Sequence, residues 1–261
     1  MRIEERTLAI VLLDIIGSTS FVQRAGDAKA AMVFQVHDRS VRDLILRFNG
    51  QEIDRSDGFL IYFETIQDAV NFGLYYQINV PERTKLNCRI GIHWSSIVVV
   101  HQDAKYIQGG AKRMELEGMG KNIAARTMSL CGKGQVLLTK DAMDEFKKQG
   151  VNSNTPKSTK YSFVGTYKFK GLKQYLGIYA IGLDKDSLRT PEDSEKAKRM
   201  GGLNVLSMNE KDVAFYNYII QFVGWVFIIS FTIVFMFLFY LFFDPILREQ
   251  LLLMAGFIYK E

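Results

Sequence analysis

The sequence predicts an α+β domain, a mixed sheet with helices packed on it, followed by one transmembrane helix. Three observations carry this prediction. Short apolar runs alternate along the chain with longer segments of helical periodicity. The pair Asp57-Gly58 is flanked by Glu52–Ser56 and Phe59–Phe63, and an Asp-Gly pair between two such segments is typical of a β-hairpin turn. Residues 213–243 form an uninterrupted stretch of 31 residues without an acidic or basic side chain.

The first strand is expected at Thr7–Leu13, an apolar run that ends at Asp14 and is followed by small residues. Ala28–Phe48 has helical periodicity and no glycine or proline, so we expect a long helix there. The other expected elements follow in order: strands at Glu52–Ser56 and Phe59–Phe63, a helix at Thr65–Tyr76, two strands within Asn87–Val100 around Trp94-Ser95-Ser96, a helix at Asn122–Leu130, a strand at Gln135–Thr139, a loop at 151–158, and two closing strands within Tyr161–Ile181.

The chain divides into a folded domain at 1–183, a polar linker at 184–212, a transmembrane helix at 213–243 and a short apolar tail at 244–261. A hydrocarbon core about 30 Å thick needs only about 20 apolar helical residues. A buried core helix is the alternative for 213–243, but core helices of this length usually keep a polar stripe. We therefore expect this helix to anchor the chain in a membrane.

The orientation of that helix follows from its flanks. The N-terminus carries charges at once (Arg2, Glu4) and has no apolar segment of the kind that begins a signal peptide. Basic residues also precede the helix, which favours a cytoplasmic location for the domain. These residues are Lys196, Lys198, Arg199 and Lys211.

The composition excludes some classes of function. The net charge of +5 and the pI of about 9.0 indicate affinity for anions, but there is no block of basic residues with interleaved aromatics, so no nucleic acid is expected. The two cysteines, Cys88 and Cys131, have no metal-binding spacing and lie in apolar stretches. We expect buried thiols in a reducing compartment, and no zinc site.

Two carboxylates are placed where they can do chemistry. Asp14 follows the first strand and Asp57 is at the hairpin tip, so neighbouring strands would bring both to one point. Mg²⁺ suits such a pair, because it binds few carboxylates and keeps waters and substrate phosphates as its other ligands. Backbone N–H groups of Ile15–Thr19, at a helix start, would face a polyphosphate. The alternative for Asp14 is a helix cap or turn former.

Five segments, taken in order, closely resemble the catalytic domain of class III adenylyl and guanylyl cyclases, over roughly residues 6–182. The resemblance implies a ferredoxin-like fold with a mainly antiparallel sheet. The segments are Leu13-Asp14-Ile15-Ile16-Gly17-Ser18-Thr19, Ser56-Asp57-Gly58-Phe59-Leu60 with Phe63, Arg89-Ile90-Gly91-Ile92-His93, Glu117-Gly118 through Asn122-Ile123-Ala124-Ala125-Arg126, and Gly134-Gln135-Val136-Leu137-Leu138.

The resemblance implies a homodimer with two composite active sites that cyclise a nucleoside triphosphate with two Mg²⁺ or Mn²⁺ ions each. Asp14 and Asp57, with Ile15, match the metal site. Asn122 and Arg126 match the pair that the partner subunit supplies, four residues apart on one helical face. Gly17, Ser18, Thr19 and Lys170 match the substrate-binding positions.

The base-selecting positions depart from the family. Ile53 stands where the family has a lysine, and Glu115 where adenylyl cyclases commonly have Asp. Arg55, on the same strand face by alternation, is expected to replace the lysine. A carboxylate accepts a hydrogen bond from the amine of adenine, cytosine or guanine, so Glu115 leaves the base open.

Three functions remain open. The first is an adenylyl cyclase with an atypical base pocket, with ATP as substrate. The second is a pyrimidine cyclase that makes cyclic CMP or cyclic UMP, as in bacterial anti-phage signalling, and loss of the lysine motivates it. The third is an inert cyclase-like dimerisation module, although such domains usually lose a metal aspartate or the Asn/Arg pair. By the same resemblance, the membrane is expected to be a bacterial inner membrane.

Overall fold

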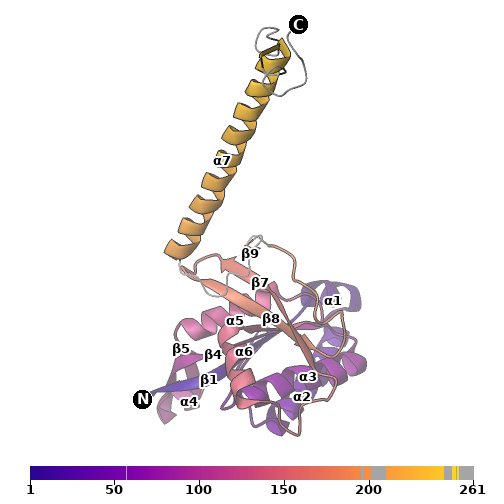
Figure 1. Cartoon of the computed structure of the whole chain (residues 1–261). Coiled ribbons are helices and arrows are strands. Elements are labelled where there is room, and N and C mark those ends of the chain that lie inside the picture. The colour runs from indigo at the N-terminus through magenta and orange to yellow at the C-terminus, as the bar shows by residue number, and fades with distance from the viewer. Residues whose placement is uncertain (57, 195–196, 201–209, 244–248, 251, 253–261) are drawn as a thin grey trace. The chain divides into compact units, whose positions relative to one another are not determined.

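The computed structural model describes the chain except for residues 57, 195–196, 201–209, 244–248, 251 and 253–261, which are drawn in grey (Figure 1). The chain divides into two compact units, Met1–Ser207 and Met208–Glu261.

The first unit is built on a sheet of nine strands among the described residues, in the order β2-β3-β1-β4-β6-β8-β7-β9, with β5 paired to β4. Only the β4–β6 pair is parallel, and every other pair in this set is antiparallel. The predicted mixed and mainly antiparallel sheet is therefore confirmed. The strands are β1 (Arg2–Ile15), β2 (Gln51–Arg55), β3 (Gly58–Phe63), β4 (Cys88–His101), β5 (Met114–Glu117), β6 (Val136–Thr139), β7 (Lys160–Phe169), β8 (Tyr175–Gly182) and β9 (Ala197–Arg199).

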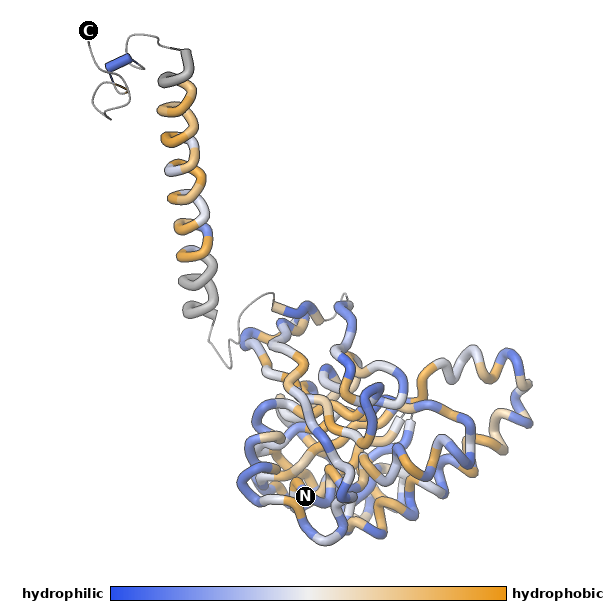
Figure 2. The backbone as a smooth tube through the Cα atoms, turned by 45° about the vertical axis from the view of Figure 1, so that its right-hand side comes forward, coloured by the Kyte–Doolittle hydropathy of each residue, from blue (hydrophilic) through white to orange (hydrophobic). Residues whose placement is uncertain are grey.

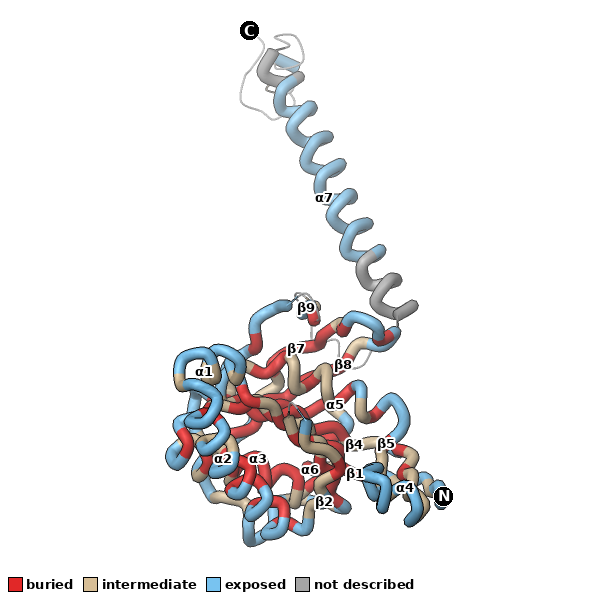
Figure 3. The backbone as a smooth tube through the Cα atoms, turned by 180° about the vertical axis from the view of Figure 1, so that it is seen from behind, coloured by how far each residue is buried: buried red, intermediate tan, exposed pale blue. Residues whose placement is uncertain are grey.

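Helices cover both faces of this sheet. The apolar sides of α2, α3 and α6 pack with Val11 and Ile61 in one core cluster, while α5 packs with Ile10 and Leu137 on the opposite face. The helices of this unit are α1 (Ser18–Ala25), α2 (Asp27–Arg47), α3 (Ile66–Thr84), α4 (Ala104–Gln108), α5 (Met119–Leu130) and α6 (Lys140–Gln149). Figure 3 shows the buried strands between these layers.

The strands differ from the expectation in two places. Cys88–His101 is one continuous strand, β4, because it pairs with β1 along its whole length, through Ser95 and Ser96. The small polar residues there do not turn the chain, since the long ladder outweighs their local preference. β1 in turn extends to Ile15, so that Asp14 lies within the strand and not after it.

Part of the expected linker is folded. The described residues 184–194 and 197–199 belong to the first unit, where β9 forms the edge of the sheet beside β7. The buried side chain of Gln135 donates hydrogen bonds to the carbonyl oxygens of Ser187 and Arg189, at 3.3 and 2.6 Å. Burial of this amide requires such partners, because an unpaired buried amide is costly. The folded unit thus continues past residue 183, the boundary that composition suggested.

The second unit contains the helix α7 (Glu210–Phe243). Within it, Tyr218–Phe239 has a mean hydropathy of 2.5 and no buried residue, so by length and composition it is able to cross a membrane. Figure 2 shows that most residues of this segment are hydrophobic. The alternative of a core helix finds no support, because these side chains are exposed. The apolar tail expected at 244–261 lies almost wholly outside the described residues.

Candidate active site

Asp14 lies between two strands that place specific residues beside it. Gly58 of β3 is opposite Asp14 on one side, and Arg89 of β4 is opposite it on the other. Arg89 donates two hydrogen bonds to one carboxylate oxygen of Asp14, from Nε at 2.9 Å and from Nη2 at 2.6 Å. Alternation along β1 places Asp14 on the same sheet face as Ile10, which is the face that carries α5.

Gly58 allows β3 to approach this position closely. A Cβ atom on Gly58 would collide with the carbonyl oxygen of Leu13, so no other residue fits without moving one of the strands. The preceding residue, Asp57, lies outside the described residues, and its assignment as the second metal ligand stays a prediction. Ile15, the third residue assigned to the metal site, is the last residue of β1 and its side chain is buried.

The helix α5 carries the predicted pair Asn122 and Arg126. Its buried side chains, among them Ile123 and Ala124, fix the helix on the sheet, so that Asn122 is left exposed and Arg126 half-buried. The helix lies very close to β4 at Gly91, where a Cβ atom would overlap the backbone of Met128 and come within 2.7 Å of the Ala124 carbonyl oxygen.

A hollow of about 480 Å³ brings the basic and amide side chains together. The charged and amide side chains that line it are those of Arg89, Asn122, Arg126 and Lys170. Lys170 is in the turn between β7 and β8, far from α5 in the sequence. Three cations around one hollow favour an anionic ligand such as a polyphosphate.

A second hollow, of about 390 Å³, contains Asp14 together with Asp54 and Gly58. Met128 lines both hollows, and Arg89 of the first is bonded to Asp14 of the second. The structure therefore places Asp14, Asn122, Arg126 and Lys170 around two adjoining hollows of one chain.

The start of α1 lines a third hollow, of about 650 Å³, which includes Ser18 and Thr19. Gly17 precedes α1 with a φ of 72°, a left-handed conformation that glycine adopts without strain. One N–H group of the expected phosphate cradle is not free, because Ile16 donates its N–H to the carbonyl oxygen of Asn87 at 2.8 Å.

The expected alternation, which would place Arg55 on the same strand face as Ile53, is wrong. A β-bulge between Glu52 and Asp54 breaks the alternation of β2, so Ile53 and Arg55 are on opposite faces of the sheet. Ile53 is buried with Ile10 and Tyr62 on the α5 face. Arg55 instead lies against α2, where its Nε donates to Asp38 Oδ2 at 3.0 Å. It cannot contact a nucleobase from the position of Ile53.

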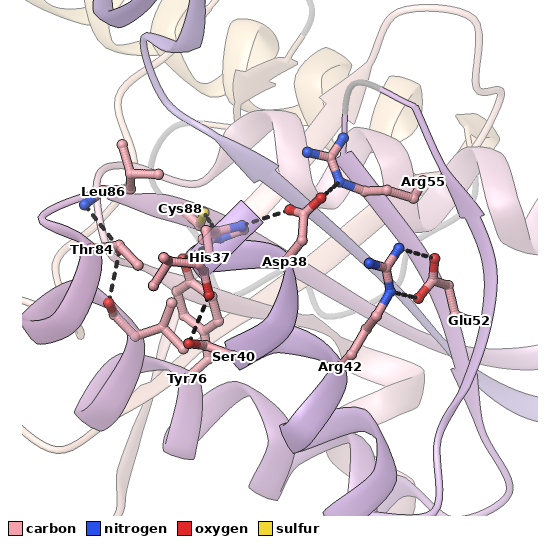
Figure 4. A network of polar contacts seen from close by, with 12 residues as sticks. His37, Asp38, Ser40, Arg42, Glu52, Arg55, Tyr76, Thr84, Leu86 and Cys88 are labelled. Atoms are coloured by element: carbon pink, nitrogen blue, oxygen red, sulfur yellow. Dashed lines mark hydrogen bonds and ion pairs between the residues drawn. The ribbon is translucent and has the colours of Figure 1, made fainter. Parts of the chain in front are cut away.

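Figure 4 shows that Arg55 belongs to a mainly buried polar network. Asp38 Oδ1 is 3.1 Å from His37 Nδ1, and His37 Nε2 in turn is 3.1 Å from the Tyr76 hydroxyl and 3.4 Å from Cys88 Sγ. Burial raises the pKa of Asp38, but the bond to His37 and the charge of Arg55 outweigh it and leave that pKa below its usual value. The network therefore holds an ionised Asp38 under the β2–β3 hairpin.

Glu115 of β5 is partly exposed and accepts a hydrogen bond at 3.1 Å from Gln102 Nε2. Within the described ranges, no three His, Cys, Asp or Glu side chains gather into a metal site of their own. A magnesium ion here would depend on Asp14, neighbouring oxygens and the substrate phosphates, a donor set that suits this ion.

Sequence reasoning gave no role to Arg89, Asp54 or Lys112. Arg89 was detectable as a charged residue that opens an apolar strand. Asp54 and Lys112 were not, because the bulge and the Asp54–Lys112 ion pair at 2.6 Å depend on long-range packing.

The buried thiols expected at Cys88 and Cys131 are confirmed, and neither cysteine forms a disulfide. Burial raises the pKa of each thiol to about 12. Both side chains are therefore protonated and unreactive at neutral pH.

No protein-family model matches the sequence, and no curated protein matches it as a relative. Solved structures do match in fold. The adenylyl cyclase CyaB from P. aeruginosa is 15% identical with a TM-score of 0.60, and the match covers 72% of this chain and 100% of that one. The guanylyl cyclase Cya2 is 19% identical with a TM-score of 0.57, over 72% and 100%.

The guanylate cyclase domain of RhGC from Catenaria anguillulae, in complex with GTP, is 16% identical with a TM-score of 0.57, over 70% of this chain and 100% of that one. The first unit of this chain therefore has the fold of class III nucleotide cyclase catalytic domains, as the sequence motifs predicted. At these identities the similarity is one of fold.

Proposed function

We propose that the chain is a nucleotide cyclase, which converts a nucleoside triphosphate into a 3′,5′-cyclic nucleotide and pyrophosphate. The observation that carries the proposal is that a cyclase fold presents both a candidate metal-binding carboxylate, Asp14, and a hollow lined by Arg89, Asn122, Arg126 and Lys170. A cyclase needs this combination of a metal-binding carboxylate and cations for a triphosphate.

Asp14 would hold the divalent cations, with Asp57 and the backbone of Ile15 as the other protein ligands. The partner that Asp14 has in the structure is itself a cation, the guanidinium of Arg89, so the position suits positive charge. Two Mg²⁺ or Mn²⁺ ions, when bound, would lower the pKa of the ribose 3′-hydroxyl and neutralise the phosphates. Arg89, released from Asp14, would then bind a phosphate oxygen, as would Lys170.

Asn122 and Arg126 would act on a nucleotide whose metal ligands belong to the partner subunit. Asn122 would orient the ribose, and Arg126 would stabilise the charge that develops on the α-phosphate as the 3′-oxygen attacks and pyrophosphate leaves. Both side chains line an open hollow on the outside of α5, where a second subunit can reach them. The functional form would be a homodimer with two such composite sites.

The substrate that we place first is ATP, with CTP or UTP as the alternative. Ile53 stands where the family has a lysine, and this buried apolar side chain cannot make the lysine's contact to the base. The loss of that contact supports the alternative, in which the product would serve anti-phage signalling. Asp14, Asn122 and Arg126 are all present around the hollows, which argues against an inert dimerisation module.

Product analysis separates these functions. The full chain, purified in detergent, is incubated with Mn²⁺ and each of ATP, GTP, CTP and UTP, and products are identified by mass spectrometry. We expect one cyclic nucleotide to dominate, and Arg126→Gln to reduce its rate at least about a hundredfold. Lys148→Gln, at an exposed lysine of α6, serves as the matched control and is expected to keep the rate. A chain that is folded but forms no cyclic product from any of the four would contradict the proposal.

We also propose that α7 anchors the enzyme in a bacterial inner membrane with the catalytic unit in the cytoplasm. The support is the exposed apolar segment Tyr218–Phe239 and the basic residues before it. Membranes that contain the full chain are washed with alkaline carbonate and treated with protease from either side. Release by carbonate, or cleavage of the catalytic unit from the periplasmic side, would contradict this proposal.

A further inference from the structure

The bulge in β2 changes which side chains of that strand reach the α5 face. In a regular strand the side chains of Ile53 and Arg55 would lie on one face of the sheet, and the side chain of Asp54 would lie on the opposite face. Because the register shifts between Glu52 and Asp54, Ile53 packs in the core with Ile10, while Asp54 lines the hollow that contains Asp14. The bulge therefore puts a carboxylate where a regular strand would not.

Asp54 has a cationic partner from another element. Lys112, in the segment before β5, places its Nζ 2.6 Å from Asp54 Oδ1. The side chain of Lys112 is 48% exposed and that of Asp54 is 29% exposed, so a ligand can reach both. The pair thus presents one hydrogen-bond acceptor, which lines the hollow, next to one donor that is bonded to it.

The surroundings of Asp54 fit a flat, partly apolar ligand. The same hollow is lined by Leu12, Leu60 and Met128, and by Lys121, which is next to Asn122 on α5. Apolar side chains bind the faces of a nucleobase, while polar groups at one edge of the pocket select its hydrogen-bonding edge.

We propose that Asp54 and Lys112 together read the Watson–Crick edge of the substrate's base. This inference rests on the proposed nucleotide-binding function of the same site. The Asp54 carboxylate would accept a hydrogen bond from an amine or ring N–H, and the Lys112 ammonium would donate one to the neighbouring ring nitrogen or carbonyl oxygen. The pair takes the place of the lysine that Ile53 has replaced.

Base preference in binding tests the assignment without requiring turnover. Unreactive α,β-methylene analogues of ATP, GTP, CTP and UTP are titrated into the full chain in detergent with Mg²⁺. We expect the wild-type protein to bind its best analogue at least about tenfold more tightly than its worst, because hydrogen bonds to charged groups discriminate strongly. Asp54→Asn and Lys112→Met are each expected to reduce that ratio to about threefold or less.

Two further variants separate reading of the base from a structural role. Glu52→Gln, on the same strand as Asp54, breaks the ion pair of 2.8 Å with Arg42 of α2, and it is expected to leave the ratio unchanged. The double variant Asp54→Lys with Lys112→Asp keeps an ion pair but exchanges donor and acceptor. It is expected to move the preference between the bases with an amine at N6 or N4 (adenine, cytosine) and the bases with a carbonyl oxygen at the corresponding position, O6 or O4 (guanine, uracil).

The outcomes also distinguish this inference from the proposed function. If the ratio collapses in the single variants and the wild-type protein forms no cyclic product, the cyclase proposal fails and the base-reading pair stands. If the wild-type protein binds no analogue, binds all four equally, or keeps its ratio in both single variants, the pair does not read the base. An equal loss of affinity for all four analogues would assign the pair a structural role and overturn the inference.

Discussion

Arg89 and Asp14 lie directly opposite each other on β4 and β1, and both donor bonds of the guanidinium end on the same oxygen of Asp14. Arg89 is therefore bonded to a carboxylate oxygen that a divalent cation would need as a ligand. Metal binding and the Arg89–Asp14 pair compete, and cation binding would free the guanidinium for a phosphate group.

Arg89→Met is expected to strengthen metal binding and weaken catalysis. Without the competing guanidinium, the affinity for Mn²⁺ should rise about fivefold, which corresponds to about 1 kcal/mol for a partly exposed pair. Isothermal titration with Mn²⁺, without nucleotide, measures this change, and the KM for the triphosphate should rise. Lys121→Met is the matched control, since Lys121 lines the hollow that contains Asp14 but pairs with Glu117 instead. Weaker Mn²⁺ binding by Arg89→Met would contradict the competition.

Gly91→Ala is expected to displace α5 and to reduce both stability and activity. The added methyl group meets the backbone of α5 at Met128 and Ala124, which cannot rotate away, so a loss of about 1–3 kcal/mol or more is expected. Thermal unfolding and product formation measure the two effects. Gly73→Ala is the control, because its methyl group meets side-chain atoms and no strand backbone, with Val136 at 3.1 Å and Ile92 at 3.8 Å. Equal unfolding temperatures for both variants would mean that α5 does not lie so close to β4.

His93 is expected to make the fold less stable in mild acid. It is buried and shares a hydrogen bond of 2.8 Å with Thr139 Oγ1, and burial lowers the pKa of its imidazole to about 4. The unfolded chain binds the proton near pH 6.5, so the stabilisation from a neutral His93 is complete above that pH. It decreases as the pH falls from about 6.5 to about 4, by up to about 3 kcal/mol.

Chemical unfolding between pH 4 and pH 8 tests this prediction. His93→Gln should flatten the pH dependence in that window, while His101→Gln, at a partly exposed histidine, should leave most of it. An unchanged pH dependence in His93→Gln would show that other groups cause the acid sensitivity.

The local sequence pattern predicted the elements that local forces determine. The hairpin at Gly58, the long helix α2 and the helix with Asn122 and Arg126 each correspond to a clear periodicity or turn signal. β4 was divided in two because Ser95 and Ser96 have little strand preference, and only the ladder to β1 keeps them extended.

The candidate site was predicted only in part, because some of its residues are placed by long-range packing and not by local sequence signals. Asp14 and Arg126 were found through motifs, but the side chains at the base position were not. A single bulge at Ile53 reverses the faces of the following residues, and the sequence carries no mark of it. The partner of Asp54 comes from Lys112, 58 positions later in the chain, and such pairs follow from packing and not from spacing.

Complementation between two inactive variants tests most directly whether the active site is shared between subunits. Asp14→Asn removes the metal carboxylate, and Arg126→Ala removes the transition-state cation, so each homodimer should be inactive. In a mixture that exchanges subunits freely, half of the dimers are heterodimers with one intact site. We expect the mixture to recover about a quarter of the wild-type rate. Purified heterodimers, identified by two different tags, that form no cyclic nucleotide would contradict it.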